Sequence, residues 1–263
     1  MPRHRMETSG DGRLSINTIT IREMEKILSE LKAMRLPGMA QTWLNLMEGH
    51  KLESLSLPDG MRLMLQGESD ARRANRTHRL IKGARFRYNV TLHDIAADSA
   101  RGIEQSKLDQ AATCAFVKQG EAVIITGPTG TGKSWLATAL GHHACVCGYK
   151  TRYFGMNRLF EEITMARIES RLPRFFERIA KTDLLILDDF GMKRLNAEQV
   201  IDLMEIIEDR HGRKATIIAS QVPVSGWYET LESNTTAADA ILDRIIHSAT
   251  RFELCGDSLR KNT

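Results

Sequence analysis

Apolar side chains in the first third of the chain recur every three or four residues, which is the spacing of helices with one buried face. The pattern predicts a helix over 19–34, a second helix over 39–47 after a break at Pro37, and a longer helix over 59–81. We therefore expect a small all-α N-terminal domain over 19–87.

The segments on either side of this domain have a different character. Residues 1–18 contain few apolar side chains and include Gly10 and Gly12, so the composition predicts a mobile tail. Residues 88–118 precede the first strand-like run, and we interpret them as a linker with a lead-in helix.

Beyond residue 118 the pattern changes, and short apolar runs alternate with longer helical stretches. Five runs are interpreted as strands: Ala122–Thr126, Lys150–Phe154, Leu184–Asp188, Thr216–Ser220 and Arg251–Leu254. Such alternation is typical of a parallel sheet with helices on both faces. The predicted fold class is therefore α/β, with a five-stranded parallel sheet in a domain over 119–263.

The composition, with 42% hydrophobic and 27% charged residues, is that of an ordinary globular protein. No apolar run approaches the roughly 20 residues that span a bilayer, and the polar N-terminus does not resemble a secretory signal. The chain contains four cysteines: Cys114, Cys145, Cys147 and Cys255. Their number and spacing fit neither a disulfide framework nor a zinc knuckle, and His142 and His143 are interpreted as surface or packing residues. We expect a cytoplasmic protein with reduced thiols and no membrane partner.

Positive charge is concentrated in one segment. Residues 70–87 hold seven basic side chains and one acidic side chain, a net charge of +6 against +4 for the whole chain. The basic residues are Arg72, Arg73, Arg76, Arg79, Lys82, Arg85 and Arg87. On a helix, Arg72, Arg76 and Arg79 share a face that can follow a phosphate backbone, and the few interleaved aromatic residues favour duplex DNA over single strands. The alternative is a solvated basic helix without a partner.

The strongest motif is G-x-x-x-x-G-K-[ST], which the chain matches at every fixed position between a predicted strand and a predicted helix. Its residues are Gly127, Pro128, Thr129, Gly130, Thr131, Gly132, Lys133 and Ser134. The glycines let backbone N–H groups surround phosphate oxygens, Lys133 reaches the β- and γ-phosphates, and Ser134 is a candidate Mg²⁺ ligand. Trp135 follows directly as a further candidate nucleotide contact. A glycine-rich turn without a ligand is the alternative.

Two predicted strands end in polar residues that suit the same site. The run Leu184–Asp189 ends in two acids: Asp188 is a candidate Mg²⁺ ligand acting through water, and Asp189 is a candidate group for polarising the attacking water. Thr216–Ser220 is followed by Gln221, and either Ser220 or Gln221 is placed to touch the γ-phosphate or that water. The alternatives are a solvated turn after Leu187 and a helix cap by Ser220.

Several segments in this order resemble the IstB family, whose members are ATP-binding helpers of insertion-sequence transposition. They are GPTGTGKS (127–134), LLILDDFG (184–191), QVIDLMEIIEDRHGR (199–213), TIIASQVPVSGW (216–227), DAILDRIIHSA (239–249) and GDSLRK (256–261). The resemblance runs from about Arg72 to the C-terminus. It places the chain in the AAA+ class, beside the DnaC and DnaI helicase loaders.

The resemblance implies ATP hydrolysis, with Mg²⁺, at the interfaces of a homo-oligomer, where each subunit supplies an arginine to its neighbour. The matching residue is Arg244, although Arg244 could instead pair with Asp243 on a solvated helix. Arg260 corresponds to a second sensor arginine that contacts nucleotide, and the lid helices of fuller AAA+ proteins are minimal or absent. Many AAA+ enzymes have Glu where this chain has Asp189, which bears on the rate of turnover.

We therefore expect an ATPase that assembles on duplex DNA, remodels it and delivers it to a partner transposase. A helicase loader that acts on single-stranded DNA is the main alternative within the class. A non-catalytic DNA-binding scaffold that uses ATP only for assembly and a small-molecule kinase are alternatives from other classes.

Overall fold

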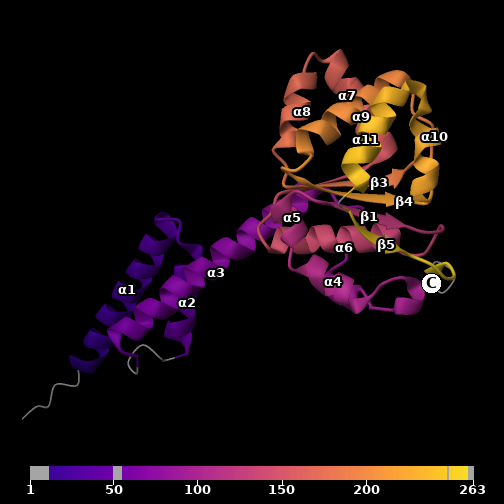
Figure 1. Cartoon of the computed structure of the whole chain (residues 1–263). Helices are drawn as coiled ribbons and strands as arrows, with labels where there is room; N and C mark the ends of the chain where they lie inside the picture. Colours follow the sequence, from indigo (N-terminus) through magenta and orange to yellow (C-terminus); the bar gives the residue numbers. More distant parts are fainter. Residues whose placement is uncertain (1–11, 50–54, 248, 260–263) are drawn as a thin grey trace, which may run out of the picture. The chain divides into compact units, whose positions relative to one another are not determined.

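The computed structural model describes residues 12–49, 55–247 and 249–259 (Figure 1). The protein forms two compact units, which divide between Arg76 and Thr77. No helix in the described part of the chain is long and apolar enough to cross a membrane.

The division between the units falls earlier than the predicted boundary at residue 87. The Arg152 guanidinium donates a hydrogen bond of 3.1 Å to the carbonyl oxygen of Gly83. The Phe86 ring packs against the second unit, close to the backbone of Gly141. These contacts hold residues 77–87 on the second unit, and helical spacing along one continuous helix contains no signal for them.

The first unit contains α1 (Gly12–Ala33), α2 (Pro37–Glu48) and the N-terminal part of α3 (Leu57–Ala84). Because α1 begins at Gly12, residues 12–18 are helical, whereas their composition predicts a mobile tail. A glycine at the first position of a helix interrupts no intrahelical hydrogen bond, since the first N–H groups of a helix have no partner within it. The rest of the predicted tail, residues 1–11, lies outside the described residues.

Helices α2 and α3 pack closely because a glycine lies at their contact. A Cβ on Gly38 would lie 2.3 Å from the carbonyl oxygen of Gly67, so a larger residue would force the helices apart. The buried Glu68 carboxylate accepts hydrogen bonds from the backbone N–H groups of Gly38 (2.9 Å) and Met39 (3.2 Å). A carboxylate at a helix N-terminus satisfies donors that have no partner within the helix.

The second unit is built on five parallel strands in the order β2-β3-β4-β1-β5. The strands are β1 (Ala122–Thr126), β2 (Thr151–Gly155), β3 (Leu184–Phe190), β4 (Ala215–Ser220) and β5 (Thr250–Glu253). The predicted α/β class and the five-stranded parallel sheet are confirmed, and β1 has the bounds that its apolar run predicts.

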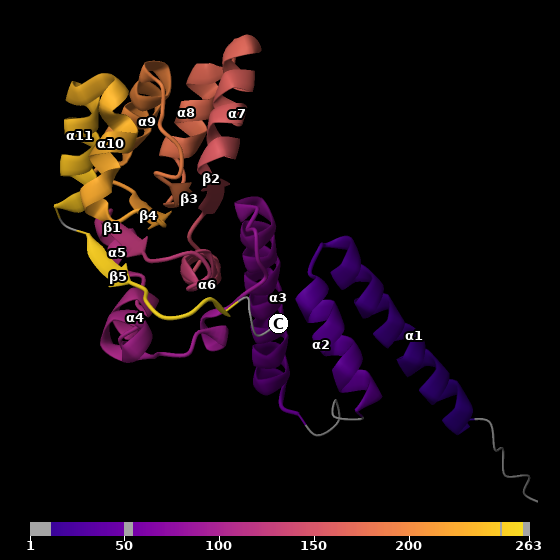
Figure 2. The same cartoon turned by 90° about the vertical axis from the view of Figure 1, so that its right-hand side faces the viewer.

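Helices cover both faces of the sheet, as the alternating pattern predicts (Figure 1 and Figure 2). One face carries α4 (Gln105–Ala112), α5 (Ala115–Gln119) and α6 (Lys133–Val146). The other carries α7 (Met156–Ile168), α8 (Leu172–Ala180), α9 (Ala197–Arg210), α10 (Trp227–Leu231) and α11 (Thr235–Ile246). Successive strand residues enter opposite cores: Val123 packs on the α6 side, and Ile124 packs on the α9 side.

Short 3₁₀ turns connect these elements: Leu92–Asp94, Ser99–Arg101, Val224–Gly226 and Glu232–Asn234. After β5 the described residues continue to Leu259. The carboxyl ends of β1, β3 and β4 lie at one edge of the sheet, because the strands are parallel neighbours. This edge is where ligands bind in open α/β sheets.

Candidate nucleotide-binding site

The loop from β1 to α6 has the backbone of a phosphate cradle. Gly127, Gly130 and Gly132 have φ angles of 148°, 86° and 100°, which L side chains rarely adopt. A Cβ on Gly127 would lie 2.2 Å from the Leu254 carbonyl oxygen, so this position has room only for glycine. The conformation lets successive N–H groups turn toward one concave surface, which suits an anion.

The lysine of the motif lies within the loop. Lys133 is the first residue of α6, its side chain is largely buried, and its Nζ donates a hydrogen bond of 2.7 Å to the Pro128 carbonyl oxygen. The Thr131 hydroxyl donates to the same oxygen at 2.9 Å. The ammonium group is therefore already held at the concave side, where the helix N-terminus adds its positive dipole.

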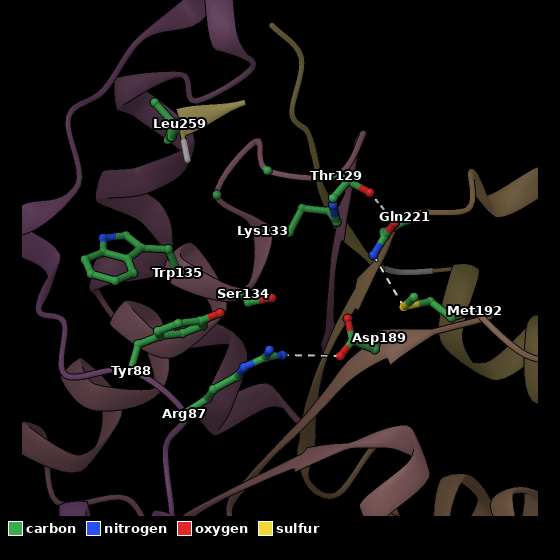
Figure 3. Close-up of a pocket in the computed structure, with 12 residues that line it drawn as sticks. Arg87, Tyr88, Thr129, Lys133, Ser134, Trp135, Asp189, Met192, Gln221 and Leu259 are labelled. Atoms are coloured by element: carbon green, nitrogen blue, oxygen red, sulfur yellow. Dashed lines mark hydrogen bonds and ion pairs between the residues drawn. The ribbon is translucent and has the colours of Figure 1, made fainter. Parts of the chain in front are cut away.

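A cavity of about 690 Å³ opens beside the loop, a volume within the range of nucleotide-sized ligand pockets (Figure 3). Its lining residues are Arg87, Tyr88, Thr129, Gly130, Gly132, Lys133, Ser134, Trp135, Asp189, Met192, Gln221 and Leu259. In Figure 3 the aromatic side chains lie on one side of Lys133 and Ser134, and Asp189 and Gln221 lie on the other side. The cavity thus has an aromatic end and a polar end.

The two acids at the end of β3 take different positions. Asp189 lines the cavity and has a φ of +60°, an unusual backbone conformation for a residue other than glycine. Asp188 is 1% exposed and does not line the cavity. Its carboxylate accepts hydrogen bonds from the Tyr153 hydroxyl and from the backbone N–H of Asp189 (2.9 Å). Asp188 therefore suits a Mg²⁺ role only through an intervening water, which is the role expected for it.

Burial of the Tyr153 phenol, followed by the negative charge of Asp188, raises the pKa of Tyr153 far above its ordinary value. The phenol is therefore a fixed hydrogen-bond donor to Asp188 at any physiological pH. This bond orients the Asp188 carboxylate at the end of the strand, and sequence spacing gives no indication of it.

The end of β4 places Gln221, not Ser220, in the cavity. Ser220 is fully buried, and its hydroxyl lies 2.7 Å from the Phe190 carbonyl oxygen and accepts from the Trp227 indole N–H at 3.2 Å. Ser220 therefore does not line the cavity, and its position lends no support to the predicted catalytic role. The Gln221 side chain lines the cavity instead, and it accepts a hydrogen bond from the Thr129 hydroxyl.

Arg87 and Tyr88 complete the cavity from a segment that the sequence places outside the ATPase domain. The Arg87 guanidinium forms an ion pair of 3.5 Å with Asp189 (Figure 3). The adjacent Tyr88 side chain, followed by Tyr153 and the Asp189 carboxylate, raises the pKa of Arg87 despite its partial burial. The Tyr88 and Trp135 rings lie 5.5 Å apart between centroids. Arg87 thus lines the nucleotide cavity, although the sequence predicts it as a DNA contact.

A family model of IstB-like ATP binding proteins matches residues 29–263. The chain belongs to this family. An insertion sequence ATP-binding protein of Sinorhizobium fredii is 39% identical over 89% of this chain and 96% of its own length. The insertion sequence IS21 ATP-binding protein of Pseudomonas aeruginosa is 29% identical over 90% of this chain and 88% of its own.

Two solved structures share the fold of the IstB-like chain. The crystal structure of the DnaC helicase loader matches with a TM-score of 0.52 and 19% identity, over 64% of this chain and 98% of that chain. The crystal structure of DnaI matches with a TM-score of 0.54 and 18% identity, over 68% and 94%. Family membership identifies the chain as a P-loop ATPase, and its fold is shared with DnaC and DnaI.

The seven basic residues of the 70–87 segment lie in different surroundings. Arg85 forms an ion pair of 3.4 Å with Glu162, and Arg87 lies in the cavity. On α3, Arg72 Nε donates a 2.7 Å hydrogen bond to Glu68, whose carboxylate caps α2. Five members of the predicted set lie on α3: Arg72, Arg73, Arg76, Arg79 and Lys82. The hypothesis of a DNA-contacting helix therefore narrows to these five.

Arg244 lies on α11, away from the nucleotide cavity of its own chain. Its guanidinium forms an ion pair of 2.5 Å with Glu208 and donates a 3.0 Å hydrogen bond to the Ala240 carbonyl oxygen. It lines a separate hollow beside Ala122, the first residue of β1, whereas the phosphate loop follows the last residue of β1. Arg260 lies outside the described residues.

Proposed function

We propose that this protein is an ATP-driven DNA-binding ATPase that assembles on duplex DNA and delivers it to the transposase of the same insertion sequence. The observation that carries the proposal is the division of the catalytic groups. The loop and Asp189 share one cavity, while Arg244 lies at the opposite end of β1. A transition state that needs an arginine would be completed by a neighbouring subunit.

The cavity suggests how ATP lies in it. The phosphates follow the loop from Gly130 to Ser134, and the γ-phosphate faces the polar end with Asp189 and Gln221. The base then falls at the aromatic end, beside Tyr88. Bound Mg²⁺, with Ser134 as a direct ligand and Asp188 as a ligand through water, would neutralise charge on the phosphates.

Asp189 is the group in the cavity that can accept a proton from an attacking water. Its ion pair with Arg87 holds it in place, and its φ of +60° is a backbone state that the surrounding fold has to maintain. Gln221 is close to the same position, because it bonds to Thr129 of the loop. An amide at this place can orient the water without exchanging a proton with it.

The DNA contact is proposed for the basic residues of α3. They project charge along a helix that is nearly free of aromatic side chains, which suits phosphate contacts more than base stacking. Membership of the IstB-like family, whose relatives are named as insertion sequence proteins, supports a transposase as the partner.

A helicase loader is the second candidate function, and the fold shared with DnaC and DnaI favours it. The two functions differ in their DNA. A transposition helper would bind duplex, whereas a loader of that class would favour single strands and a helicase partner.

The deciding experiment is a titration of duplex and single-stranded DNA of equal length with ATP, ADP or no nucleotide, with particle size followed by light scattering. We expect large particles only with ATP and duplex, and none with the control variant Lys133→Ala, which lacks the ammonium group of the loop. Small particles that prefer single strands would overturn the transposition proposal in favour of the loader. Normal ATP affinity in Lys133→Ala would contradict the role of the loop.

A further inference from the structure

Three potential metal ligands converge at the end of α6 that is remote from the phosphate loop. His143 and Cys147 lie one helical turn apart, and Cys114 comes from the junction between α4 and α5. One donor atom from each side chain lies within 4.8 Å of the other two. None of the three lines the nucleotide cavity, so the cluster is separate from the proposed ATPase site.

The distance between two of the three donor atoms matches that in a tetrahedral zinc site. Zinc bond lengths of about 2.3 Å to sulfur and about 2.05 Å to nitrogen place the two ligand atoms about 3.6 Å apart at a tetrahedral angle. The distance from Cys147 Sγ to His143 Nε2 is 3.6 Å. Cys147 is exposed and caps the C-terminus of α6, so it can make the small movement that closes the remaining gap.

The same imidazole nitrogen lies 2.8 Å from the carbonyl oxygen of Ala112, the last residue of α4. Coordination through Nε2 would exchange this hydrogen bond for a metal bond. The released carbonyl belongs to a helix terminus, where water or the next turn can satisfy it. The exchange is therefore favourable only if the metal bond is stronger than one neutral hydrogen bond, which a zinc–imidazole bond is.

Cys114 has the features of a structural ligand more than of a reactive thiol. It is 2% exposed and adopts a φ of +56°, a left-handed conformation that costs free energy for a residue with a side chain. A buried thiol is shielded from disulfide exchange with other molecules, and Cys114 still lies within reach of the donor atoms of His143 and Cys147.

We propose that Cys114, His143 and Cys147 bind one Zn²⁺ ion, with water as the fourth ligand on the exposed side of Cys147. Two thiolates and one imidazole form a ligand set that prefers zinc over magnesium or calcium, and the two negative charges balance the charge of the ion. The ion ties the junction of α4 and α5 to α6. The N-terminus of α6 carries Lys133 and Ser134, so the metal braces the helix on which the phosphate loop depends.

The test uses the full-length protein in the absence of nucleotide. It is treated with a chelator under reducing conditions and then titrated with Zn²⁺, and separately with Co²⁺ as a spectroscopic probe. Native mass spectrometry should find one ion per chain. The Co²⁺ form should show thiolate charge-transfer absorption and the strong d–d bands of tetrahedral coordination, and Zn²⁺ should raise the melting temperature.

The variants Cys147→Ser and His143→Asn should each lower Zn²⁺ affinity at least about 10-fold, since removal of a ligand costs at least as much as removal of an outer partner. Both sites are accessible at the end of a helix, so these variants avoid the buried Cys114. The matched control is Cys255→Ser, an exposed cysteine whose thiol bonds to the Ala100 carbonyl oxygen, and its affinity should be unchanged.

Two results would overturn the site. One is a wild-type protein that is folded, judged by circular dichroism, but retains no zinc. Equal zinc affinity in the wild-type protein and the two variants would count in the same way. The other is a Cys114–Cys147 disulfide, found by peptide mapping, in protein that takes up no zinc after reduction. Neither result depends on ATP hydrolysis, so the zinc site and the proposed ATPase function can fail independently.

Discussion

The phosphate loop and the basic segment both carry sequence signals, but the structure treats them differently. Every feature of the loop lies within eight consecutive residues, and five of the eight line one cavity. The basic segment is a set of like charges whose roles depend on their neighbours. The structure pairs Arg85 with Glu162, puts Arg87 into the nucleotide cavity and uses Arg72 to hold Glu68. The role of a loop residue can be predicted from the motif itself. The role of a basic residue in the 70–87 segment depends on which side chains lie beside it in the fold.

The largest expected effect concerns the part of the ATPase site that the loop does not contain. Arg244→Ala should lower ATP hydrolysis by about 10³-fold, since an arginine supplied across an interface contributes on that order. ATP affinity should change by less than about twofold, because Arg244 lies outside the cavity of its own chain. Steady-state hydrolysis and nucleotide titration measure the two quantities, and equal losses in both would remove Arg244 as a trans-acting group.

Mixing two inactive variants sharpens this test. Subunits with Arg244→Ala keep an intact Asp189, and subunits with Asp189→Asn, which are expected to assemble, keep an intact Arg244. Hydrolysis should partly return in the mixture, because some interfaces combine the two intact parts. The control is Glu208→Gln, which releases the ion-pair partner of Arg244 and should leave hydrolysis largely intact.

The second prediction tests whether the cavity hydrolyses ATP or only binds it. Asp189→Asn should lower hydrolysis at least about 100-fold while assembly with ATP and duplex DNA persists, because the amide cannot accept the proton. Asparagine is also well suited to a φ of +60°, so the backbone should not change. Rapid-quench measurement of bound ATP turnover is the readout. Unchanged turnover would favour the non-catalytic scaffold.

These two predictions also mark where sequence reasoning ends. The sheet, its parallel strands and the loop follow from apolar spacing and one motif, because both are local properties. The Tyr153 bond to Asp188 and the Arg87 bond to Asp189 join residues far apart in the chain. No periodicity encodes such pairs. The choice between Ser220 and Gln221 depended on which one faces the core, and a strand end does not reveal that in advance.

The third prediction returns to the basic segment. The triple variant Arg73→Gln, Arg76→Gln and Arg79→Gln should weaken duplex binding at least about tenfold and reduce the slope of log affinity against log salt by up to about three. Arg72 is left in place, because its loss would disturb the Glu68 cap of α2. Fluorescence anisotropy over a range of salt concentrations provides the measurement.

A matched control removes the same charge elsewhere in the first unit. Arg22, Lys26 and Lys32 lie exposed on α1, and their replacement by Gln should leave the salt slope unchanged. Equal losses in the two triple variants would show that net charge, and not the α3 surface, attracts the DNA. An unchanged affinity in the α3 variant would place the DNA contact on another surface.

The smallest expected effect concerns Tyr88. This residue directly follows the basic segment in the sequence, but its side chain lines the nucleotide cavity. If the base of the nucleotide stacks at the aromatic end, Tyr88→Ala should weaken ATP and ADP binding equally, by about tenfold, within the usual range for base–aromatic stacking. Tyr88→Phe keeps the ring and should bind both normally. Isothermal titration with both nucleotides gives the comparison. A loss confined to ATP would instead place Tyr88 at the γ-phosphate, and Arg87 beside it would then act on the same phosphate through its pairing with Asp189.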